Sequence, residues 1–278
     1  MPATAGEALQ AARARLAATS RNPRRDAELL LAHLLRCDQA ALLTHPERIL
    51  FPAEADQFES FIRRRLACEP VQYITGVQEF FGLLFEVSPG VLIPRPETEH
   101  LVEAVLERFG REASPRIVDV GTGSGAIAVA LAHALPQSLV TAVDLSPAAL
   151  AVARRNAERH GVSQRVTFLE SDLLKAIDSR DIDAVVSNPP YIAEGEVLEP
   201  QVSLYEPHSA LYAGPTGLEV YEHLIPQAGN VLRPQGWLMM EIGSGQSPTL
   251  LRLLSDWIGV SFVDDLQGIP RVVLAQSP

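Results

Sequence analysis

A tetrapeptide with unusual chemistry follows the apolar stretch at residues 182–187 and reads Asn188-Pro189-Pro190-Tyr191. Two prolines fix the backbone and remove two N–H donors, so the loop offers mainly hydrogen-bond acceptors. The side-chain oxygen of Asn188 and the carbonyl of Pro189 can each accept one hydrogen from a planar NH2 group. The ring of Tyr191 offers a surface on which a flat group can stack. These residue types predict a socket for a neutral, planar nitrogen, such as an amide or an adenine amine.

The chemistry of such a socket follows from the electronic structure of an amide, whose nitrogen is a poor nucleophile because its lone pair is delocalised. Two acceptors that hold the NH2 hydrogens would direct that lone pair at an activated methyl group, and such alignment can supply roughly 7–11 kcal/mol of the barrier. The same oxygens would stabilise the positive charge that develops on the nitrogen. We therefore predict Asn188, Pro189, Pro190 and Tyr191 as catalytic residues of a methyl transfer without a nucleophilic serine or cysteine.

A glycine-rich loop, Gly121-Thr122-Gly123-Ser124-Gly125, separates the apolar stretch at residues 117–120 from a helical pattern. Glycines permit a tight turn and let a ligand approach the backbone N–H groups at the start of a helix. Asp144 follows 19 residues after Gly125, at the end of the next expected strand. A carboxylate at that point can accept hydrogen bonds from both hydroxyls of a ribose. The loop and Asp144 together predict a cofactor that contains adenosine.

The loop alone does not decide which cofactor binds. Gly121, Gly123 and Ala126 also satisfy the spacing of a nicotinamide-dinucleotide loop, so a dehydrogenase stays open on this feature. Asp119, just before the loop, favours S-adenosylmethionine because its carboxylate suits the ammonium of a methionine moiety better than a pyrophosphate. Asp172, at the end of the third expected strand, could accept a hydrogen bond from the adenine amine.

Strand and helix patterns alternate from residue 117 onward, which predicts a mainly parallel sheet covered by helices on both faces. The carboxyl ends of parallel strands meet at one edge, so the loops that follow the strands are expected to lie together. The expected strands are 117–120, 139–143, 166–169, 182–187 and 237–242, followed by two short strands near the C-terminus. The expected helices are 126–134, 147–160, 218–232 and 248–258.

The chain before residue 70 reads differently, as a small helical module. Apolar residues recur there at helical spacing in three stripes punctuated by prolines. We expect a helical substrate-binding domain over residues 1–78, a hairpin linker over 79–98 and the α/β domain over 99–278. Within the linker, strands at 80–87 and 91–93 would flank a turn at 88–90. The three stripes are Leu9, Ala12 and Leu16; Leu29, Leu30, Leu34 and Leu35; and Phe58, Phe61, Ile62 and Leu66.

The net charge of −11 is unevenly distributed along the 278 residues. Residues 1–95 hold 11 basic and 11 acidic residues, whereas residues 96–278 hold 12 basic and 23 acidic residues. An acidic surface repels phosphate backbones and attracts basic proteins. The distribution therefore argues against nucleic acid as the direct substrate and favours a protein partner, although solubility alone would also explain it.

Composition narrows the class further, since 47% hydrophobic and 21% charged residues are typical of an ordinary folded protein. No run of about 18 apolar residues predicts a membrane span, and the N-terminus lacks the order of a signal peptide. Cys37 and Cys68 form neither a disulfide framework nor a metal-site pattern. We expect a cytoplasmic protein without a metal site or a membrane partner.

At this point the sequence resembles the peptide chain release factor N(5)-glutamine methyltransferase family, of the HemK/PrmC type. The likeness covers nearly the whole chain and rests on five separated motifs in the expected order. They are EPVQYITG at 69–76, VLIPRPETE at 91–99, DVGTGSG at 119–125, VSNPPYI at 186–192, and EP at 206–207 with GPTGL at 214–218.

This resemblance implies a class I methyltransferase domain with a Rossmann-like, seven-stranded sheet behind an N-terminal helical domain. It implies that residues 121–125 and Asp144 hold S-adenosylmethionine, with Asp119, Asp172, Leu173 and Asn188 also near it. The substrate would be the glutamine of the Gly-Gly-Gln loop in release factors, placed against the tetrapeptide and gripped partly by the helical domain. We expect a monomer, with Arg95 and Glu97 at the substrate entrance.

One position departs from some family members, which carry tryptophan where this chain has Leu173; we expect weaker cofactor binding there. A sister family methylates a glutamine of a ribosomal protein, but its segment corresponding to residues 92–99 lacks the Pro-Glu-Thr found here. A DNA adenine methyltransferase needs the same socket, yet it would have to grip phosphates and flip a base. A non-catalytic S-adenosylmethionine sensor and a dehydrogenase are further alternatives, against which the intact tetrapeptide argues.

Overall fold

The computed structural model describes residues 4–278, and the chain forms two compact units. The first extends to Val77 and also includes Leu198–Tyr205, and the second comprises Gln78–Val197 and Glu206–Pro278. The chain therefore leaves the second unit once, in its middle, to contribute eight residues to the first. The boundaries drawn from the sequence at residues 78 and 98 stay a prediction.

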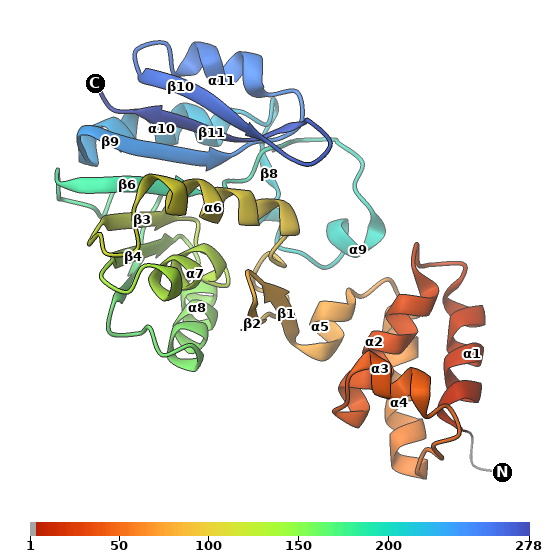
Figure 1. Ribbon diagram of the computed structural model, residues 1–278. Coiled ribbons are helices and arrows are strands. Elements are labelled where there is room, and N and C mark those ends of the chain that lie inside the picture. Colours follow the sequence, from red (N-terminus) through yellow and green to blue (C-terminus); the bar gives the residue numbers. More distant parts are fainter. Residues whose placement is uncertain (1–3) are drawn as a thin grey trace. The chain divides into compact units, whose positions relative to one another are not determined.

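The first unit is helical (Figure 1), and each apolar stripe of the sequence falls within the bounds of one of its longer helices. A capping box starts the first of them, because Glu7 accepts a hydrogen bond from the Thr4 N–H and donates its own N–H to the Thr4 hydroxyl. Two short helices escaped the sequence analysis because fewer than two turns show no periodicity. The helices are α1 (Ala5–Leu16), α2 (Pro23–Leu35), α3 (Gln39–Thr44), α4 (Pro52–Leu66) and α5 (Val71–Thr75).

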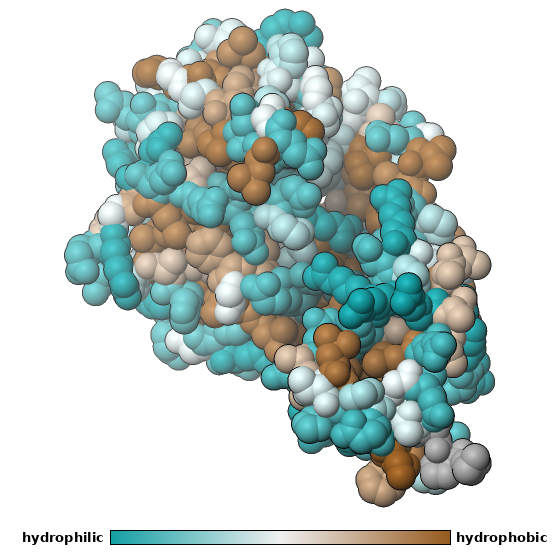
Figure 2. Space-filling view, turned by 45° about the vertical axis from the view of Figure 1, so that its right-hand side comes forward, coloured by the Kyte–Doolittle hydropathy of each residue, from teal (hydrophilic) through white to brown (hydrophobic). Residues whose placement is uncertain are grey.

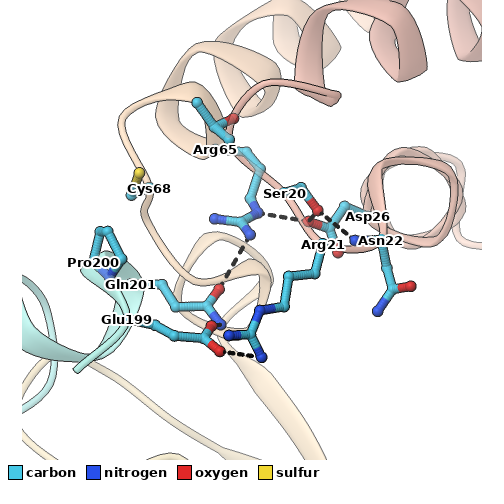
Figure 3. Close-up of a pocket in the computed structure, with 10 residues that line it drawn as sticks. Ser20, Arg21, Asn22, Asp26, Arg65, Cys68, Glu199, Pro200 and Gln201 are labelled. Carbon is cyan, nitrogen blue, oxygen red and sulfur yellow. Dashed lines mark hydrogen bonds and ion pairs between the residues drawn. The ribbon is translucent and has the colours of Figure 1, made fainter. Parts of the chain in front are cut away.

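A buried arginine joins the segment Leu198–Tyr205, which contains α9 (Pro200–Ser203), to the helices of this unit. The Arg65 guanidinium is 5% exposed and donates to the carboxylate of Asp26 at 2.7 Å and to the side-chain oxygen of Gln201 at 3.1 Å. Beside it, a cavity of about 280 Å³ is bridged by the ion pair of Arg21 and Glu199 (Figure 3). Arg65 and Gln201, which this hydrogen bond joins, are 136 positions apart in the sequence.

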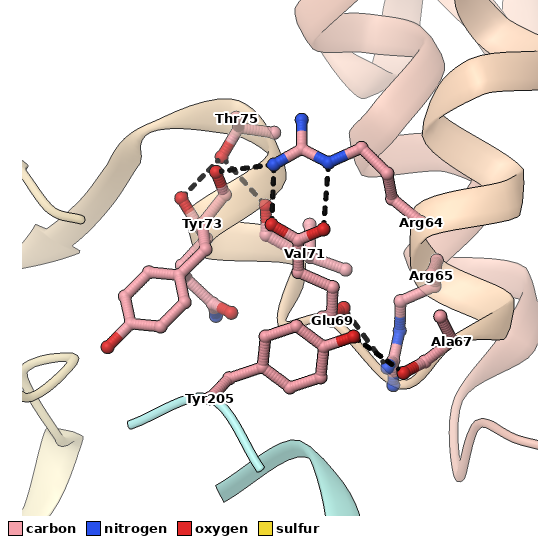
Figure 4. Close-up of polar contacts among 9 residues, drawn as sticks. Arg64, Arg65, Ala67, Glu69, Val71, Tyr73, Thr75 and Tyr205 are labelled. Carbon is pink, nitrogen blue, oxygen red and sulfur yellow. Dashed lines mark hydrogen bonds and ion pairs between the residues drawn. The ribbon is translucent and has the colours of Figure 1, made fainter. Parts of the chain in front are cut away.

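The turn that follows α4 is fixed by a second group of polar contacts (Figure 4). Arg64 donates two hydrogen bonds to the carboxylate of Glu69, at 2.8 and 2.5 Å, and a third to the carbonyl of Tyr73. The hydroxyl of Tyr205 donates to the carbonyl of Ala67 at 2.8 Å. Tyr205, the last residue of the segment Leu198–Tyr205, is therefore hydrogen-bonded to the same turn that the contacts of Arg64 stabilise.

Replacing Arg65 by alanine is expected to destabilise the protein by about 3 kcal/mol, because the nearly buried Asp26 carboxylate loses its ion-pair partner. Arg63 supplies the matched control on the same helix: its side chain is 69% exposed and lies 3.8 Å from Glu59. We expect Arg63→Ala to change stability by less than about 0.5 kcal/mol. Urea denaturation of both variants measures the difference, and equal midpoints would contradict the structural role given to Arg65.

The second unit contains a seven-stranded sheet in the order β10-β11-β9-β6-β3-β4-β5. Five neighbouring strands are parallel; at one edge β11 pairs antiparallel with β9, and β10 pairs antiparallel with β11. The predicted fold class, a mainly parallel seven-stranded α/β sheet, is confirmed. The strands are β3 (Arg116–Val120), β4 (Leu139–Asp144), β5 (Val166–Glu170), β6 (Ile182–Ser187), β9 (Leu232–Glu241), β10 (Ile258–Asp264) and β11 (Pro270–Gln276).

Helices cover both faces of this sheet, as Figure 1 shows for α6 and α7 on one side and α10 on the other. Successive strand residues point to opposite faces, so Ile117 packs in one core and Val118 in the other. Both faces are apolar, which explains why the strands read as nearly continuous hydrophobic runs. The helices are α6 (Glu99–Arg108), α7 (Ala126–Ala134) and α8 (Pro147–Arg159) on one face, and α10 (Glu219–Val231) and α11 (Ser247–Leu253) on the other.

Two details of the predicted secondary structure were wrong. The hairpin is formed by β1 (Val77–Phe80) and β2 (Leu83–Glu86), not by strands around residues 88–90. Phe81 and Gly82 both have positive φ, of 52° and 72°, as a two-residue type I′ turn requires. The helix expected to reach residue 258 ends at Leu253, and β10 begins at Ile258. The remaining short elements are η1 (Pro96–Thr98), β7 (Ile192–Ala193), η2 (His208–Ala210) and β8 (Tyr212–Gly214).

Hydrophobic and hydrophilic residues are mixed over the face of the molecule drawn in Figure 2, with the hydrophobic ones in several separate groups. Large apolar side chains that are more than half exposed occur in both units, for example Phe51 before α4 and Leu145 after β4. Such exposed residues are ordinary on a folded protein. Within residues 4–278, no helix combines the length and apolarity that a membrane crossing needs.

Candidate active site

The tetrapeptide Asn188–Tyr191 directly follows β6, at the carboxyl edge of the sheet. Ser187 pairs with Val120 in the parallel register of β6 and β3, and its hydroxyl donates to the Val120 carbonyl at 2.8 Å. The last residues of these strands are 67 positions apart in sequence. The sheet therefore brings the start of the glycine loop beside the start of the tetrapeptide, as the sequence predicted.

Asn188 is oriented by a threonine that the sequence analysis did not select. Its side-chain nitrogen donates to the hydroxyl of Thr98 at 2.9 Å, which leaves the amide oxygen as the acceptor. Thr98 is 4% exposed and lies in a stretch anchored by the buried Glu206, which accepts hydrogen bonds from the N–H of Ile93 and the side chain of Arg95. Arg95 is thus tied to a buried carboxylate; its place at a substrate entrance stays a prediction.

Tyr191 is fixed through both its backbone and its side chain. Its carbonyl accepts a hydrogen bond from the amide of Gln246 at 3.0 Å, and its hydroxyl lies 3.3 Å from a carboxylate oxygen of Glu241. Gly217 has a positive φ of 77°, and a Cβ there would stand 2.6 Å from the Tyr191 carbonyl. Burial raises the pKa of Tyr191 above its ordinary value, so the phenol stays protonated and can donate.

The glycine loop is held by backbone contacts at the end of β4. The N–H groups of Gly121 and Thr122 both donate to the carbonyl of Val143, at 2.9 and 3.0 Å. Gly125 caps α7 with φ +81°, and a Cβ there would meet that of Ala153 at 3.0 Å. A larger residue at Gly125 would therefore be strained and would push against α8.

Asp119 is fully buried, and its two carboxylate oxygens differ. One oxygen accepts hydrogen bonds from the Thr122 hydroxyl at 2.6 Å and the Ala128 N–H at 3.2 Å. The other oxygen has no hydrogen-bond partner among residues 4–278. Burial raises the pKa of Asp119 to about 7. A buried carboxylate oxygen without a donor suits a cationic group, so the chemistry of Asp119 fits the ammonium of S-adenosylmethionine.

Asp144 stands at the end of β4, where it bridges the glycine loop and the start of α8. Its carboxylate accepts the Gly123 N–H and the Ser146 N–H, each at 2.9 Å. Burial raises its pKa from the ordinary value, with the backbone hydrogen bonds opposing that change. Each oxygen retains a lone pair beyond these bonds, so the carboxylate can still accept donors from a ribose.

The other residues proposed for the cofactor have varied surroundings. Asp172 is 55% exposed and pairs with Lys175 at 2.5 Å, and Leu173 has an unusual positive φ of 53°. Thr122 and Ser124 are buried within the loop. Their contacts with adenine or methionine, and those of Asp172 and Leu173, stay predictions.

Sequence reasoning missed the polar residues that support the tetrapeptide from behind, namely Thr98, Gln246 and Glu241. Glu241 is 2% exposed at the end of β9, where an acidic residue follows the apolar run of that strand. A charged residue continuing a buried apolar run is the signal that could have found it. Thr98 stood within a quoted motif, but nothing local indicated its partner.

The fold and the site define a class, the methyltransferases with a Rossmann-like sheet. The family described as methyltransferase small domain matches residues 97–203. Two solved structures share the fold: the T. Thermophilus 16S rRNA N2 G1207 methyltransferase in complex with AdoMet and guanosine, and the hMettl16 catalytic domain in complex with an RNA hairpin. The first has a TM-score of 0.55 and 21% identity over 73% of this chain and 50% of the other. The second has a TM-score of 0.57 and 19% identity over 82% and 84%.

Closer relatives identify the particular family. The PrmC N-terminal domain matches residues 7–76. The release factor glutamine methyltransferase of Koribacter versatilis is 49% identical over 94% of each chain, and that of Moorella thermoacetica is 45% identical over 98% of each. The chain belongs to the release factor glutamine methyltransferase family. The resemblance seen in the sequence is confirmed.

Proposed function

We propose that this protein transfers the methyl group of S-adenosylmethionine to the side-chain amide nitrogen of the glutamine in the Gly-Gly-Gln loop of peptide chain release factors. The observation that carries the proposal is the orientation of Asn188, whose amide nitrogen is engaged by Thr98 so that its oxygen is the available acceptor. Membership of the family supplies the substrate. An acceptor fixed in this way suits a substrate that presents an NH2 group.

The cofactor would be held by the loops after β3 and β4. S-adenosylmethionine supplies an electrophilic methyl group on a sulfonium centre. Asp119 would accept its ammonium, Asp144 would accept its ribose hydroxyls, and the backbone of Gly121 to Gly125 would lie along it. Asp172 and Leu173 would contact the adenine, by a hydrogen bond and an apolar surface respectively.

At the glutamine, the Asn188 oxygen and the Pro189 carbonyl would each accept one amide hydrogen, while the Tyr191 ring would pack against the amide plane. Pro190 keeps this turn rigid and adds no competing N–H donor. During transfer the nitrogen lone pair would form the new bond to the methyl carbon as the carbon–sulfur bond breaks, and the nitrogen would then lose one proton to solvent. The two acceptors lower the barrier by fixing the lone pair and stabilising the charge on nitrogen.

The partner would be a release factor, gripped in part by the helical unit, and nucleic acid would not be a direct substrate. Residues 96–278 carry a net negative charge, which would attract a partner with a basic protein surface and repel a phosphate backbone. Release factors act in translation, so the protein would work in the cytoplasm. We propose that it works as a monomer.

Transfer of labelled methyl from S-adenosylmethionine to a purified release factor tests the proposal. The same factor with alanine in place of the loop glutamine, a ribosomal protein and duplex DNA serve as parallel substrates. Label on the unaltered factor alone is the expected result. Label on DNA or on the ribosomal protein in preference to the factor, or on the alanine variant, would contradict it.

A further inference from the structure

A buried acid lies behind the tetrapeptide and holds two of its neighbours. Glu241 accepts a hydrogen bond from the Thr98 hydroxyl at 2.6 Å on one carboxylate oxygen, and the Tyr191 hydroxyl lies 3.3 Å from the other. Its backbone carbonyl accepts the Tyr221 hydroxyl at 3.0 Å. With the bond from Asn188 to Thr98 at 2.9 Å, a continuous chain runs from the catalytic amide to the carboxylate.

The carboxylate of Glu241 determines which group donates and which accepts in each of these hydrogen bonds. An ionised carboxylate only accepts, so the single hydroxyl proton of Thr98 must point to Glu241. The remaining lone pairs of that hydroxyl can only accept, so Asn188 must turn its NH2 group toward Thr98. The amide oxygen is thereby left for a substrate. One buried negative charge thus decides which end of a distant amide serves the reaction.

Glu241 is not neutralised by an ion pair within 4 Å among the described residues. The groups that face it are Tyr191 from the tetrapeptide, Tyr221 from α10, Glu97 from η1 and Arg271 from β11. Arg271 itself pairs with an aspartate on the β10–β11 turn. Burial raises the pKa of Glu241 to about 7. Because a buried carboxylate without an ion-pair partner is unfavourable for stability, its presence here indicates a functional role.

We propose that Thr98 and Glu241 are positioning residues of the methyl transfer, which hold Asn188 with its amide oxygen toward the substrate nitrogen. The inference rests on the proposed function and names two residues that act through a third. Neither needs to touch the substrate. Their role is to exclude the flipped amide, which would present NH2 to the substrate NH2 and could accept nothing from it.

Protonation of Glu241 removes this control. A protonated carboxyl can donate to the Thr98 hydroxyl, which can then donate to the oxygen of Asn188 after the amide rotates by half a turn. In that state the donors and acceptors of the hydrogen bonds among Glu241, Thr98 and Asn188 are exchanged, and the site loses one acceptor for the substrate NH2 group. The kcat of the wild-type enzyme should therefore fall as the pH drops through about 7.

Thr98→Val and Thr98→Ser form the matched pair that tests the proposal, because valine keeps the shape of threonine and serine keeps the hydroxyl. We expect Thr98→Val to lower kcat on release factor by about 10²-fold, the usual effect of misplacing a catalytic group. Its KM for S-adenosylmethionine should change by less than about threefold, and Thr98→Ser should restore most of kcat. Equal kcat for the two variants would overturn the proposal.

Glu241→Gln adds a readout that a purely structural role would not move. Glutamine fills the same space but does not titrate, so the fall of kcat below about pH 7 should disappear, and kcat at pH 8 should lie below that of the wild type. An unchanged pH profile, measured at saturating S-adenosylmethionine to exclude titration of Asp119, would contradict the inference.

The wild-type enzyme separates failure of the proposed function from failure of the positioning role. If it labels no release factor, the proposed function fails; if it does and Thr98→Val is fully active, only the positioning role fails.

Discussion

Replacing Asn188 by alanine will lower kcat for methyl transfer by about 10²–10³-fold, the loss that follows removal of one preorganised hydrogen-bonding group at a reacting centre. The affinity for S-adenosylmethionine should survive in good part, falling by no more than about tenfold. The physical reason is that the Asn188 oxygen accepts a hydrogen of the attacking nitrogen. It matters most as positive charge develops there.

The loss should appear in kcat and not in the KM for release factor, since the contact strengthens in the transition state. Single-turnover transfer and calorimetric titration of S-adenosylmethionine separate the two quantities. Tyr191→Phe is the comparison within the same loop: it keeps the ring and removes only the hydroxyl that lies 3.3 Å from Glu241. Its loss of kcat should be much smaller. An Asn188→Ala enzyme with wild-type kcat would disprove the socket for a planar nitrogen.

The parts of the site whose position in the fold follows from the sequence are those encoded over short stretches. The tetrapeptide follows β6, which is mostly apolar, and the glycine loop follows β3, so each is placed by its own strand. The parallel sheet then aligns the strand ends without further information. For this reason the sequence alone places the tetrapeptide and the glycine loop at the same edge of the sheet, where Ser187 and Val120 pair.

The supporting residues could not be found in this way, because their partners are distant in sequence. The hydrogen bond between Thr98 and Glu241 joins positions 143 apart, and Arg65 meets Gln201 across 136 positions. Hydrophobic periodicity predicts which face of a helix or strand is buried, but it does not predict which polar group from a distant part of the sequence will pack against that face. The return of Leu198–Tyr205 to the helical unit is likewise a tertiary feature without a local pattern.

The misplaced hairpin shows a different limit. Ser88-Pro89-Gly90 carries the usual turn residues, whereas the actual turn uses Phe81, which adopts a positive φ of 52° despite its bulk. The N–H of Phe81 donates to the carboxylate of Glu99 at 2.9 Å, and that of Gly82 donates to Glu79 at 2.7 Å. These contacts offset the unfavourable backbone conformation. A turn stabilised from another element is invisible to rules based on turn composition.

Replacing Asp144 by alanine will have its main effect on the cofactor, raising the Kd for S-adenosylmethionine by about 10²-fold or more. The carboxylate accepts the N–H groups of Gly123 and Ser146, both at 2.9 Å, and hydrogen bonds to a charged group contribute about 1.5–3 kcal/mol each. Alanine would release the glycine loop and also remove the acceptor proposed for the ribose. At saturating cofactor, kcat should fall by less than about tenfold, since Asp144 touches no reacting atom.

Asp172→Ala is the matched control, because it removes another carboxylate that follows a strand of the same sheet. Asp172 is 55% exposed and pairs with Lys175, and its proposed contact is a single hydrogen bond to adenine, so we expect the Kd to rise by only about threefold. Asp144→Asn should fall between the two, since its NH2 must face one of the two backbone N–H donors. Calorimetric titration of all three variants measures the order. If Asp172→Ala weakened binding as much as Asp144→Ala, the ribose would have to be assigned to an acceptor other than Asp144, because Asp144 accepts the Gly123 N–H of the loop in addition to the proposed ribose hydroxyls.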